Sequence, residues 1–272
     1  MDDADFKACC AAVYGSDIAE VVLGPSFHPG GRRLTRRLAR MARIRPGERV
    51  IDVASGAGDS ALLVAEEFNT TVHGVDLSPL LVERATDAAT AAGVSGRVSF
   101  EVGDAEHLRV ARSVDAVFCE CALCTFPNKD RAVEGFARAL RRGGRLCLSD
   151  VVVDRSRLPI ELTGIMARVA CVAEALPVEG YLRLLERSGL QVCDLERHDD
   201  AIVEMVERLD ARLALVAAAG VDDLAGLDLA AIRALARSAV AAARDGVLGY
   251  VLITAELVEA APPESGGTRR TS

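Results

Sequence analysis

Tryptophan is absent from this chain of 272 residues, and aromatic residues as a whole make up only 4% of it. The formal net charge is −8, and no stripe of basic residues stands out. A nucleic acid would find few rings on which to stack its bases and no cationic surface to contact its phosphates. These shortages argue against a nucleic-acid substrate or partner.

Long hydrophobic runs are also missing. No apolar stretch reaches the roughly 20 residues that a membrane-spanning helix requires. The sequence begins MDDADFKACC, which is acidic and polar, whereas a secretory signal starts with basic residues and an apolar segment. We therefore expect a protein without membrane association, located in the cytoplasm.

The GxGxxG fingerprint of dinucleotide-binding proteins is a third absence. Residues 49–59 read RVIDVASGAGD, an apolar strand that ends in a turn with Gly56 and Gly58, but no third glycine follows and Ser60 stands two residues past Gly58. Pyrophosphate needs that third glycine to approach the helix N-terminus. The pattern disfavours NAD and FAD, yet two glycines without Cβ atoms still predict a turn that seats a nucleotide-like cofactor.

A second stretch supports a cofactor of this kind. Residues 71–78 read TVHGVDLS and place Asp76 at the carboxyl end of a second predicted strand, about twenty residues beyond the glycine turn. A carboxylate at this position can accept hydrogen bonds from both hydroxyls of a ribose. The two stretches together predict a ribose-containing ligand at the carboxyl edge of a sheet.

Strand and helix patterns alternate along the chain, and half of the residues are apolar, which is enough for a substantial core. The alternation indicates an α/β fold with a Rossmann-like, seven-stranded, mostly parallel sheet and helices on both faces. The predicted strands cover 49–53, 72–76, 98–102, 114–120, 145–151, 191–197 and 249–257. The predicted helices cover 60–68, 79–92, 130–141, 161–173 and 178–188, followed by an alanine-rich helical stretch over 201–243 that breaks near Gly220.

The sequence also suggests how the chain is divided. Residues 1–45 predict a helical cap over the cofactor, 46–200 the cofactor-binding core, 201–245 a helical insertion and 246–258 the last core strand. The remaining residues, 259–272, are polar and rich in glycine and serine. We expect that tail to be disordered.

Eight cysteines are present, and three of them lie at the predicted ligand-binding edge of the sheet. Cys119, Cys121 and Cys124 occur in FCECALCTFPNKD, where the fourth strand ends and a loop begins. Because alternate strand residues share a face, Cys119 and Cys121 project together and Glu120 projects to the other side. No metal site is predicted, because the spacing C-x-C-x2-C lacks a second pair of ligands.

The cysteines have two possible interpretations. Free cysteine is often simply a small buried residue, and we favour that interpretation for Cys119, Cys147 and Cys193, which lie within predicted strands. Cys121 and Cys124 stand beside a loop at the mouth of the site, where a chemical role is favoured.

Four motifs, in order along residues 46–257, resemble those of the class I S-adenosylmethionine-dependent methyltransferases. They are VIDVASGAGD for the methionine part of the cofactor, VHGVDLS for the ribose, EVGDAEHL for the adenine, and the strand DAVFCECA that runs into the site. The usual first glycine of the turn is Ala54 here. The resemblance implies S-adenosylmethionine as cofactor and the following contact residues: Asp52, Ala54, Gly56, Gly58, Asp76, Leu77, Asp104, Ala105 and Cys119.

Within that family, the segments CALCTFPNKD, RLCLSDVVVDRSRLP and MARVACVAEALPVEGYLRLLERSGL resemble the arsenite methyltransferases. Cys121 and Cys171 match two cysteines of that branch. The resemblance implies that these thiolates, with a third from the N-terminal region, hold trivalent arsenic. Cys9 and Cys10 are the candidates for the third, although the Tyr-Gly pair that precedes them in the family follows them here, and Cys124 is an additional cysteine.

A metalloid held by thiolates suits methyl transfer. Three soft sulfur ligands leave the trivalent metalloid a lone pair directed away from them, so no proton has to be removed in the transfer step. The leading hypothesis is therefore methyl transfer to a small acceptor such as trivalent arsenic. Selenium, mercury or an organic thiol would suit the same cysteines, for which the candidates are Cys10, Cys121, Cys124 and Cys171.

Two other hypotheses stay open at this stage. An oxygen or nitrogen acceptor would need a base, for which His28, in SFHPGG, and Glu120 are the candidates, so a methyltransferase for a small organic substrate is the alternative. A non-catalytic, thiol-rich sensor on the same fold is disfavoured by the intact cofactor motifs. The sequence leaves the oligomeric state open.

Overall fold

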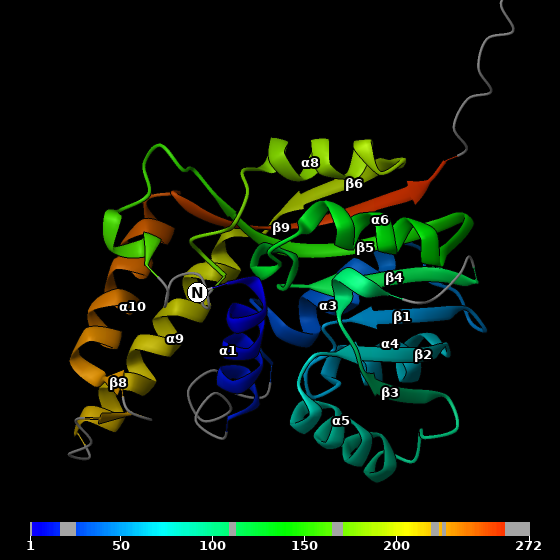
Figure 1. Ribbon diagram of the computed structural model, residues 1–272, viewed down its shortest axis with the longest axis horizontal. Coiled ribbons are helices and arrows are strands. Elements are labelled where there is room, and N and C mark those ends of the chain that lie inside the picture. Colours follow the sequence, from blue (N-terminus) through cyan, green and yellow to red (C-terminus); the bar gives the residue numbers. More distant parts are fainter. Residues whose placement is uncertain are drawn as a thin grey trace, which may run out of the picture.

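The computed structural model describes residues 2–16, 26–108, 113–164, 171–218, 223–224 and 227–258. Its centre is a seven-stranded sheet with the strand order β3-β2-β1-β4-β5-β9-β6 (Figure 1). Strands β1 to β5 run parallel, whereas β9 is antiparallel to both of its neighbours, β5 and β6. The predicted Rossmann-like α/β fold with a mostly parallel sheet is confirmed.

All seven predicted strands are present. They are β1 (Arg49–Val53), β2 (Thr71–Asp76), β3 (Val98–Val102), β4 (Val114–Glu120), β5 (Leu140–Val153), β6 (Leu190–Arg197) and β9 (Leu248–Leu257). The strand β5 starts five residues before the prediction, because Leu140 already pairs with Val114 ahead of a register shift. A short hairpin, β7 (Asp223–Leu224) with β8 (Leu227–Asp228), was not predicted.

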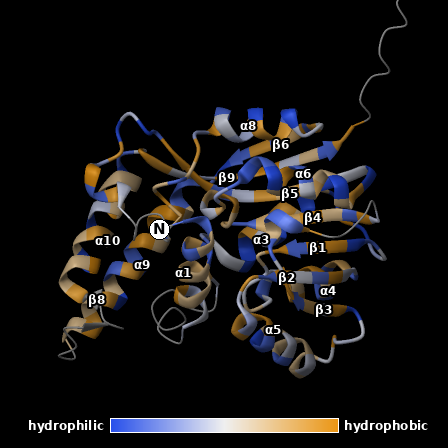
Figure 2. Ribbon diagram, in the orientation of Figure 1, coloured by the Kyte–Doolittle hydropathy of each residue, from blue (hydrophilic) through white to orange (hydrophobic). Residues whose placement is uncertain are grey.

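Helices cover both faces of the sheet. One face is buried by α3 (Gly31–Met41), α4 (Asp59–Phe68), α5 (Pro79–Ala91), α9 (Asp199–Ala218) and α10 (Leu229–Arg244), and the other by α6 (Lys129–Ala139) and α8 (Val178–Arg187). Each covering helix buries an apolar side; α8, for example, buries Tyr181, Leu184 and Leu185 and alternates in hydropathy along its length (Figure 2). Two apolar layers therefore enclose the sheet.

The helix predicted over 161–173 falls only partly within the described residues. The described part holds only a 3₁₀ turn, Ile160–Thr163, after which Gly164 is extended. Residues 165–170 lie outside the described residues, and Cys171 has a left-handed backbone with φ of +64°. The alanine-rich stretch, in contrast, forms α9 and α10 with the predicted break between them.

Cys193 was expected to be buried in an apolar strand, and that expectation is wrong. Its side chain is exposed, while Cys119 and Cys147 are fully buried as expected. The reason is its position: β6 is an edge strand, and its register with β9 shifts between Val192 and Asp194. Free edges of sheets are exposed to solvent more than central strands are.

The helix α1 (Asp3–Gly15) sets up the site by lying over the carboxyl ends of the central strands (Figure 1). The Asp2 side chain caps this helix by accepting a hydrogen bond from the Asp5 amide at 2.8 Å. Among the described residues, no helix combines the length and apolar character needed to cross a membrane. The predicted tail, 259–272, lies outside the described residues.

Candidate functional site

A cavity of about 1200 Å³, its open mouth included, lies at the carboxyl ends of β1, β2 and β4. It has room for a nucleoside cofactor and a small second molecule. Predicted site residues that line it are Cys10, His28, Asp52, Ala54, Gly56, Asp76, Leu77, Asp104, Ala105, Glu120 and Cys121. Four others, Gly58, Cys119, Cys124 and Cys171, do not line it.

The turn after β1 is shaped for close approach of a ligand. Ala54 and Gly56 both have left-handed backbones, with φ of +56° and +54°. The Gly56 amide donates a hydrogen bond to Asp76 Oδ2 at 2.8 Å, which ties the turn to the end of β2. Gly58 was predicted to leave space for the ligand, but in the structure a Cβ at this position would lie 2.8 Å from the Phe100 ring. Gly58 permits helix-to-sheet packing and does not face the cavity.

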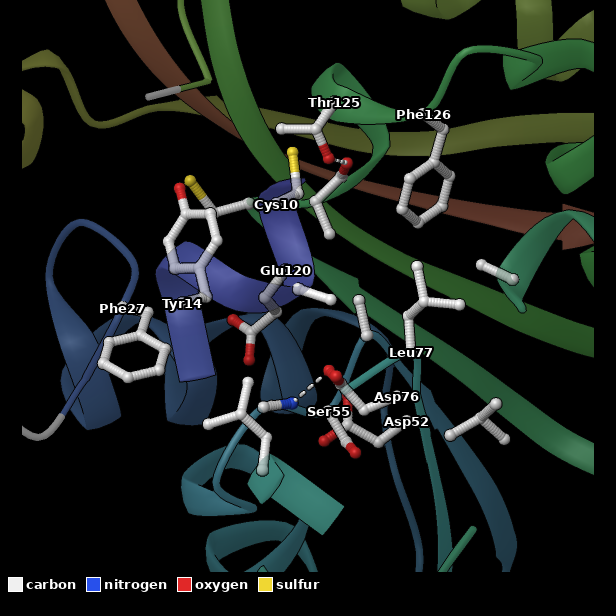
Figure 3. A pocket seen from close by; sticks show the side chains of 18 of the residues that line it. Cys10, Tyr14, Phe27, Asp52, Ser55, Asp76, Leu77, Glu120, Thr125 and Phe126 are labelled. Atoms are coloured by element: carbon white, nitrogen blue, oxygen red, sulfur yellow. Dashed lines mark hydrogen bonds between the residues drawn. The ribbon is translucent and has the colours of Figure 1, made fainter. Parts of the chain in front are cut away.

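Three carboxyl groups meet on the floor of this cavity. In Figure 3, Glu120 lies between the Tyr14 ring and the pair formed by Asp52 and Asp76. Burial, with the charges of Glu120 and Asp76 close by, raises the pKa of Asp52 well above its ordinary value. Its Oδ2 atom is buried and has no hydrogen-bond partner among the described residues.

This floor fits a cationic ligand. S-adenosylmethionine carries an ammonium and a sulfonium, and an ammonium beside Asp52 would satisfy the unpaired oxygen and lower the cost of burying the carboxylates. Asp76 has room for ribose hydroxyls, because each of its oxygens accepts one amide, from Gly56 or Ser78, and keeps a lone pair. The residues present therefore fit this cofactor.

Asp104, predicted to contact adenine, is already bound by α1. Lys7 Nζ lies 3.0 Å from Asp104 Oδ2 and 2.7 Å from Glu106 Oε2, and His107 Nδ1 lies 2.8 Å from Asp104 Oδ2. Burial alone would raise the pKa of Asp104, but hydrogen bonds from the Glu106 amide, Lys7 and His107 outweigh it and lower that pKa. The sequence did not single out Lys7, because the ion pair joins residues 97 positions apart.

Glu120 is held by hydroxyl groups. Ser60 Oγ donates to Glu120 Oε2 at 2.6 Å, Thr35 Oγ1 at 3.0 Å, and Ser149 Oγ donates to Oε1 at 3.3 Å. The Tyr250 hydroxyl in turn donates to Ser149 at 2.8 Å. The Glu120 carboxyl group is thus the common acceptor of a ring of hydroxyl donors, which holds its side chain in place.

His28 reaches the same network through Thr35. Its Nε2 lies 3.4 Å from Thr35 Oγ1, and its Nδ1 lies 3.2 Å from the Pro29 carbonyl oxygen. A carbonyl oxygen only accepts hydrogen bonds, so Nδ1 is the donor in its contact with Pro29, whereas the contact between Nε2 and Thr35 is long for a hydrogen bond. His28 therefore stands at the edge of the hydroxyl network around Glu120.

A thiol cluster, defined as Cys121, Cys124 and Cys171, lies directly behind the cavity wall. Cys121 lines the cavity, and Cys171 Sγ lies 3.3 Å from the Cys121 carbonyl oxygen and 3.8 Å from the Tyr14 hydroxyl. Cys124 is fully buried in the turn Leu123–Thr125. Cys121 and Cys171 both have left-handed backbones, with φ of +52° and +64°, a strain that surrounding structure must hold.

The three thiols differ in acidity. Hydrogen bonds from Cys121 and Cys124 lower the pKa of Cys171 well below its ordinary value, whereas the same contact with Cys171 raises the pKa of Cys121 and burial raises that of Cys124. The Cys121 carbonyl oxygen acts the other way, because the hydrogen bond that it accepts from the Cys171 thiol stabilises the neutral form of Cys171. The hydrogen bonds from the two other thiols prevail and the pKa of Cys171 is lowered, so the first thiolate of the cluster forms at Cys171.

Two charged groups flank the thiol cluster. Asp150 is fully buried, its Oδ2 accepts the Cys124 amide at 2.8 Å, and burial raises its pKa to about 7. Lys129 donates to the Phe126 carbonyl at 2.9 Å, and burial lowers its pKa. In the part of the chain that the structure describes, no three His, Cys, Asp or Glu side chains are arranged to hold a metal ion.

The two N-terminal cysteines, Cys9 and Cys10, differ in whether they line the cavity. Cys10 lines the cavity on the side of α1 that also carries Phe6, Lys7 and Tyr14, whereas Cys9 does not line it. Residues four apart share a helix face, so Cys10 and Tyr14 project together (Figure 3). Cys10 is thus the N-terminal thiol nearest the site.

Comparison with known proteins shows one family. The family model described as "Methyltransferase domain" matches residues 44–195. The chain is 32% identical over 169 residues to "Methyltransferase GfsG" of Streptomyces halstedii, covering 61% of this chain and 60% of that protein. It is 34% identical over 204 residues to "Arsenite methyltransferase" of Halobacterium salinarum, covering 72% and 49%. The chain thus spans about half to three fifths of these relatives' length.

Among solved structures, the putative sarcosine dimethylglycine methyltransferase from Galdieria sulphuraria is similar with a TM-score of 0.74, covering 84% of this chain and 86% of that one. At 16% identity this likeness shows the fold alone. Further relatives are named as O-methyltransferases and phosphoethanolamine N-methyltransferases, so the relatives differ in acceptor.

Proposed function

The chain belongs to the methyltransferase domain family, of the class I S-adenosylmethionine-dependent type, and from that premise we propose that it methylates a trivalent metalloid such as arsenic. The observation that carries the proposal is the thiol cluster. Three cysteines from two separate loops converge behind the cofactor cavity, and two of them hold strained backbones. Simple burial of a small residue requires neither feature.

The cofactor cavity supplies the other half of the argument. When bound, S-adenosylmethionine supplies an electrophilic methyl group on a sulfonium. Asp76 would accept hydrogen bonds from its ribose, and Asp52 with Glu120 would face its ammonium. Asp104 and Lys7 would border the adenine. Cys121 lines this same cavity, so an acceptor held by its sulfur would adjoin the cofactor.

The thiol cluster suits a soft acceptor. For each hydroxyl group of arsenous acid that is replaced, one thiol loses a proton, one As–S bond forms and one As–O bond breaks, and the displaced hydroxyl takes up one proton and leaves as water. The exchange is therefore neutral in protons, whether the thiol ionises before or during the attack. Cys171 contacts both other thiols and is the first to ionise, so it would attack first, with Cys121 next. Cys124 or Cys10 would complete the set after a side-chain rotation, because no three-ligand arrangement exists among the described residues before binding.

The same network weakens the case for an organic acceptor. Glu120 accepts three hydroxyl hydrogen bonds, so it would have to give up existing contacts in order to take a proton from a substrate. Methyl transfer to an organic oxygen or nitrogen is the second candidate function, and it is supported by the O- and N-methyltransferases among the relatives. If it holds, His28 and Glu120 are the residues to change.

The test is methyl transfer from labelled S-adenosylmethionine to arsenite in the presence of a reducing thiol, with products identified by mass. We expect methylated arsenic from the intact chain and none from Cys121→Ser or Cys171→Ser. The matched control is Cys193→Ser, because Cys193 is an exposed cysteine of β6 outside the cavity, and it should keep full activity. Equilibrium binding of S-adenosylmethionine should survive in all three variants. Tight cofactor binding without methylated arsenic would refute the metalloid proposal.

A further inference from the structure

A second cavity adjoins the cofactor cavity. It encloses about 700 Å³, its mouth included, between the start of α3 and one side of α9. Ser26 and His28 line both cavities, so a small molecule could extend from one to the other past these two side chains. Neither the cofactor nor the thiol cluster uses this space.

Positive charge gathers in the second cavity. Its described lining includes Arg33 from α3 and Arg208 and Arg212 from α9, with Glu204 as the acidic side chain. Glu204 lies 3.5 Å from Arg208 and is the one acidic side chain in the described lining, beside three arginines. The chain as a whole has a net charge of −8, and the first cavity has carboxylates on its floor. The second cavity therefore has the opposite electrostatic character.

Arg33 differs from its neighbours on α3. Arg32 pairs with Asp59 at 2.9 Å, and Arg36 pairs with Glu67 at 2.6 Å. No carboxylate pairs with Arg33 within the described ranges of the chain. Its guanidinium therefore keeps its capacity to bind an added anion in a bidentate manner.

The start of α3 adds donors of another kind. Gly30 is the N-cap, no side chain caps this end, and the first turn holds no acidic residue. The Ser26 Oγ atom is buried and has no hydrogen-bond partner among the described residues. It lies beside the helix start, since a Cβ on Gly31 would be 3.4 Å from it. The Gly31 amide already donates to the His28 carbonyl oxygen at 3.3 Å, so the following amides of the first turn are the ones that, with the helix dipole, favour an anion.

From this geometry we infer that the second cavity binds a carboxylate or phosphate group of a small organic molecule whose other end reaches the cofactor cavity past His28. Arg33 and Arg208 supply the charge, and Ser26 with the α3 amides supplies neutral donors. Met205 and Leu209 offer apolar contact for the carbon part of the ligand. This site goes beyond the proposed function, because it depends on α3 and α9 and on none of the cysteines.

Isothermal titration calorimetry of the full chain with inorganic phosphate, and separately with succinate, at matched low ionic strength tests the site. We expect saturable binding that weakens about tenfold in Arg33→Gln and in Arg208→Gln, and severalfold in Ser26→Ala. The control is Arg183→Gln, because Arg183 is an exposed arginine of α8 outside this cavity, and it should bind like the intact chain.

The two anions distinguish the ligand class. Tighter binding of phosphate identifies a phosphate monoester, and tighter binding of succinate identifies a carboxylate. Equal affinity in every variant, or saturable binding of neither anion, would overturn the site. Thermal unfolding confirms that each variant folds, and titration with S-adenosylmethionine should give unchanged affinity in Arg33→Gln and Arg208→Gln, whose side chains do not line the cofactor cavity. Anion binding is measured by calorimetry and arsenite methylation by product mass. A failure of one proposal can therefore be told apart from a failure of the other.

Discussion

The hydroxyl oxygen of Tyr14 lies 3.8 Å from the sulfur of Cys171, across 157 positions of sequence. The contact joins α1 to the thiol cluster, and the Tyr14 ring is also 5.9 Å from the ring of Phe27. Burial raises the pKa of Tyr14 well above its ordinary value, so the hydroxyl keeps its proton and can donate it to a thiolate. The N-terminal helix therefore contacts the thiol cluster as well as covering the cavity.

Tyr14→Phe should raise the pKa of Cys171. The hydroxyl is one of the donors that lower this pKa, after the hydrogen bonds from Cys121 and Cys124. The measurement is a pH titration of thiolate ultraviolet absorbance, with the same titration of a Cys171→Ser background subtracted. Tyr250→Phe, which removes a hydroxyl bound to Ser149, is the matched control and should leave the midpoint in place. An unchanged midpoint in Tyr14→Phe would show that the contact does not act on the sulfur.

Asp150→Asn should flatten the pH dependence of stability. The pKa of Asp150 is about 7 in the folded chain and near 3.8 in the unfolded chain. Between these values the folded form holds a proton that the unfolded form has released, so Asp150 makes the free energy of unfolding fall as pH rises. The slope is at most about 1.4 kcal/mol per pH unit. Below the lower value, both forms are protonated and the effect disappears.

Urea unfolding at a series of pH values measures this slope. The difference between intact chain and Asp150→Asn should grow as pH rises through this window and level off above the folded pKa. Asp87→Asn is the control, because Asp87 is an exposed residue of α5. Parallel curves for the intact chain and Asp150→Asn would contradict the assignment.

Lys7→Met should destabilise the chain and loosen α1. The change removes both ion pairs of Lys7 and leaves the carboxyl group of Glu106, a buried residue, with the Asn128 amide as its remaining partner among the described residues. Loss of a partner for a buried charged group costs about 1–3 kcal/mol. The free energy of unfolding in urea measures it, and stopped-flow release of S-adenosylmethionine should become faster.

Arg187→Gln is the matched control for that change. The pair between Arg187 and Asp130 is highly exposed on both sides, 62% for each side chain. Exposed ion pairs contribute little, so this variant should lose less than about 1 kcal/mol. Equal losses in Lys7→Met and Arg187→Gln would mean that burial of the Lys7 pairs adds nothing.

Ala54→Gly should stabilise the chain slightly. Ala54 has φ of +56°, where a Cβ costs about 1–2 kcal/mol, and the greater freedom of glycine in the unfolded chain offsets part of that gain. A net gain of about 0.5 kcal/mol is expected in urea unfolding. Ala211→Gly, on an exposed position of the helix α9, should instead lose about 1 kcal/mol. A loss in both variants would show that Ala54 is not strained.

The sequence determined the cofactor side of this protein, because the signals there are local. An apolar run predicted β1, the glycine turn followed it directly, and Asp76 stands one strand further on. The hydrogen bond from Gly56 to Asp76 follows from two adjacent parallel strands that end at the same edge. The alternation of strands and helices fixed the sheet in the same way, since periodicity within one element needs no knowledge of its neighbours.

Tertiary structure alone decided which distant side chains meet. Family resemblance singled out Cys121 and Cys171, but only packing brought Cys124 and Tyr14 to the same sulfur and left Cys193 on an exposed edge. Packing also paired Lys7 with Asp104 and brought Arg33 and Arg208 to the lining of one cavity. Local sequence patterns carry no information about distances between elements, because these depend on how helices pack over the edge of the sheet. The thiol cluster and the arginine-lined cavity therefore depend on the tertiary structure, whereas the cofactor turn can be predicted from the local sequence.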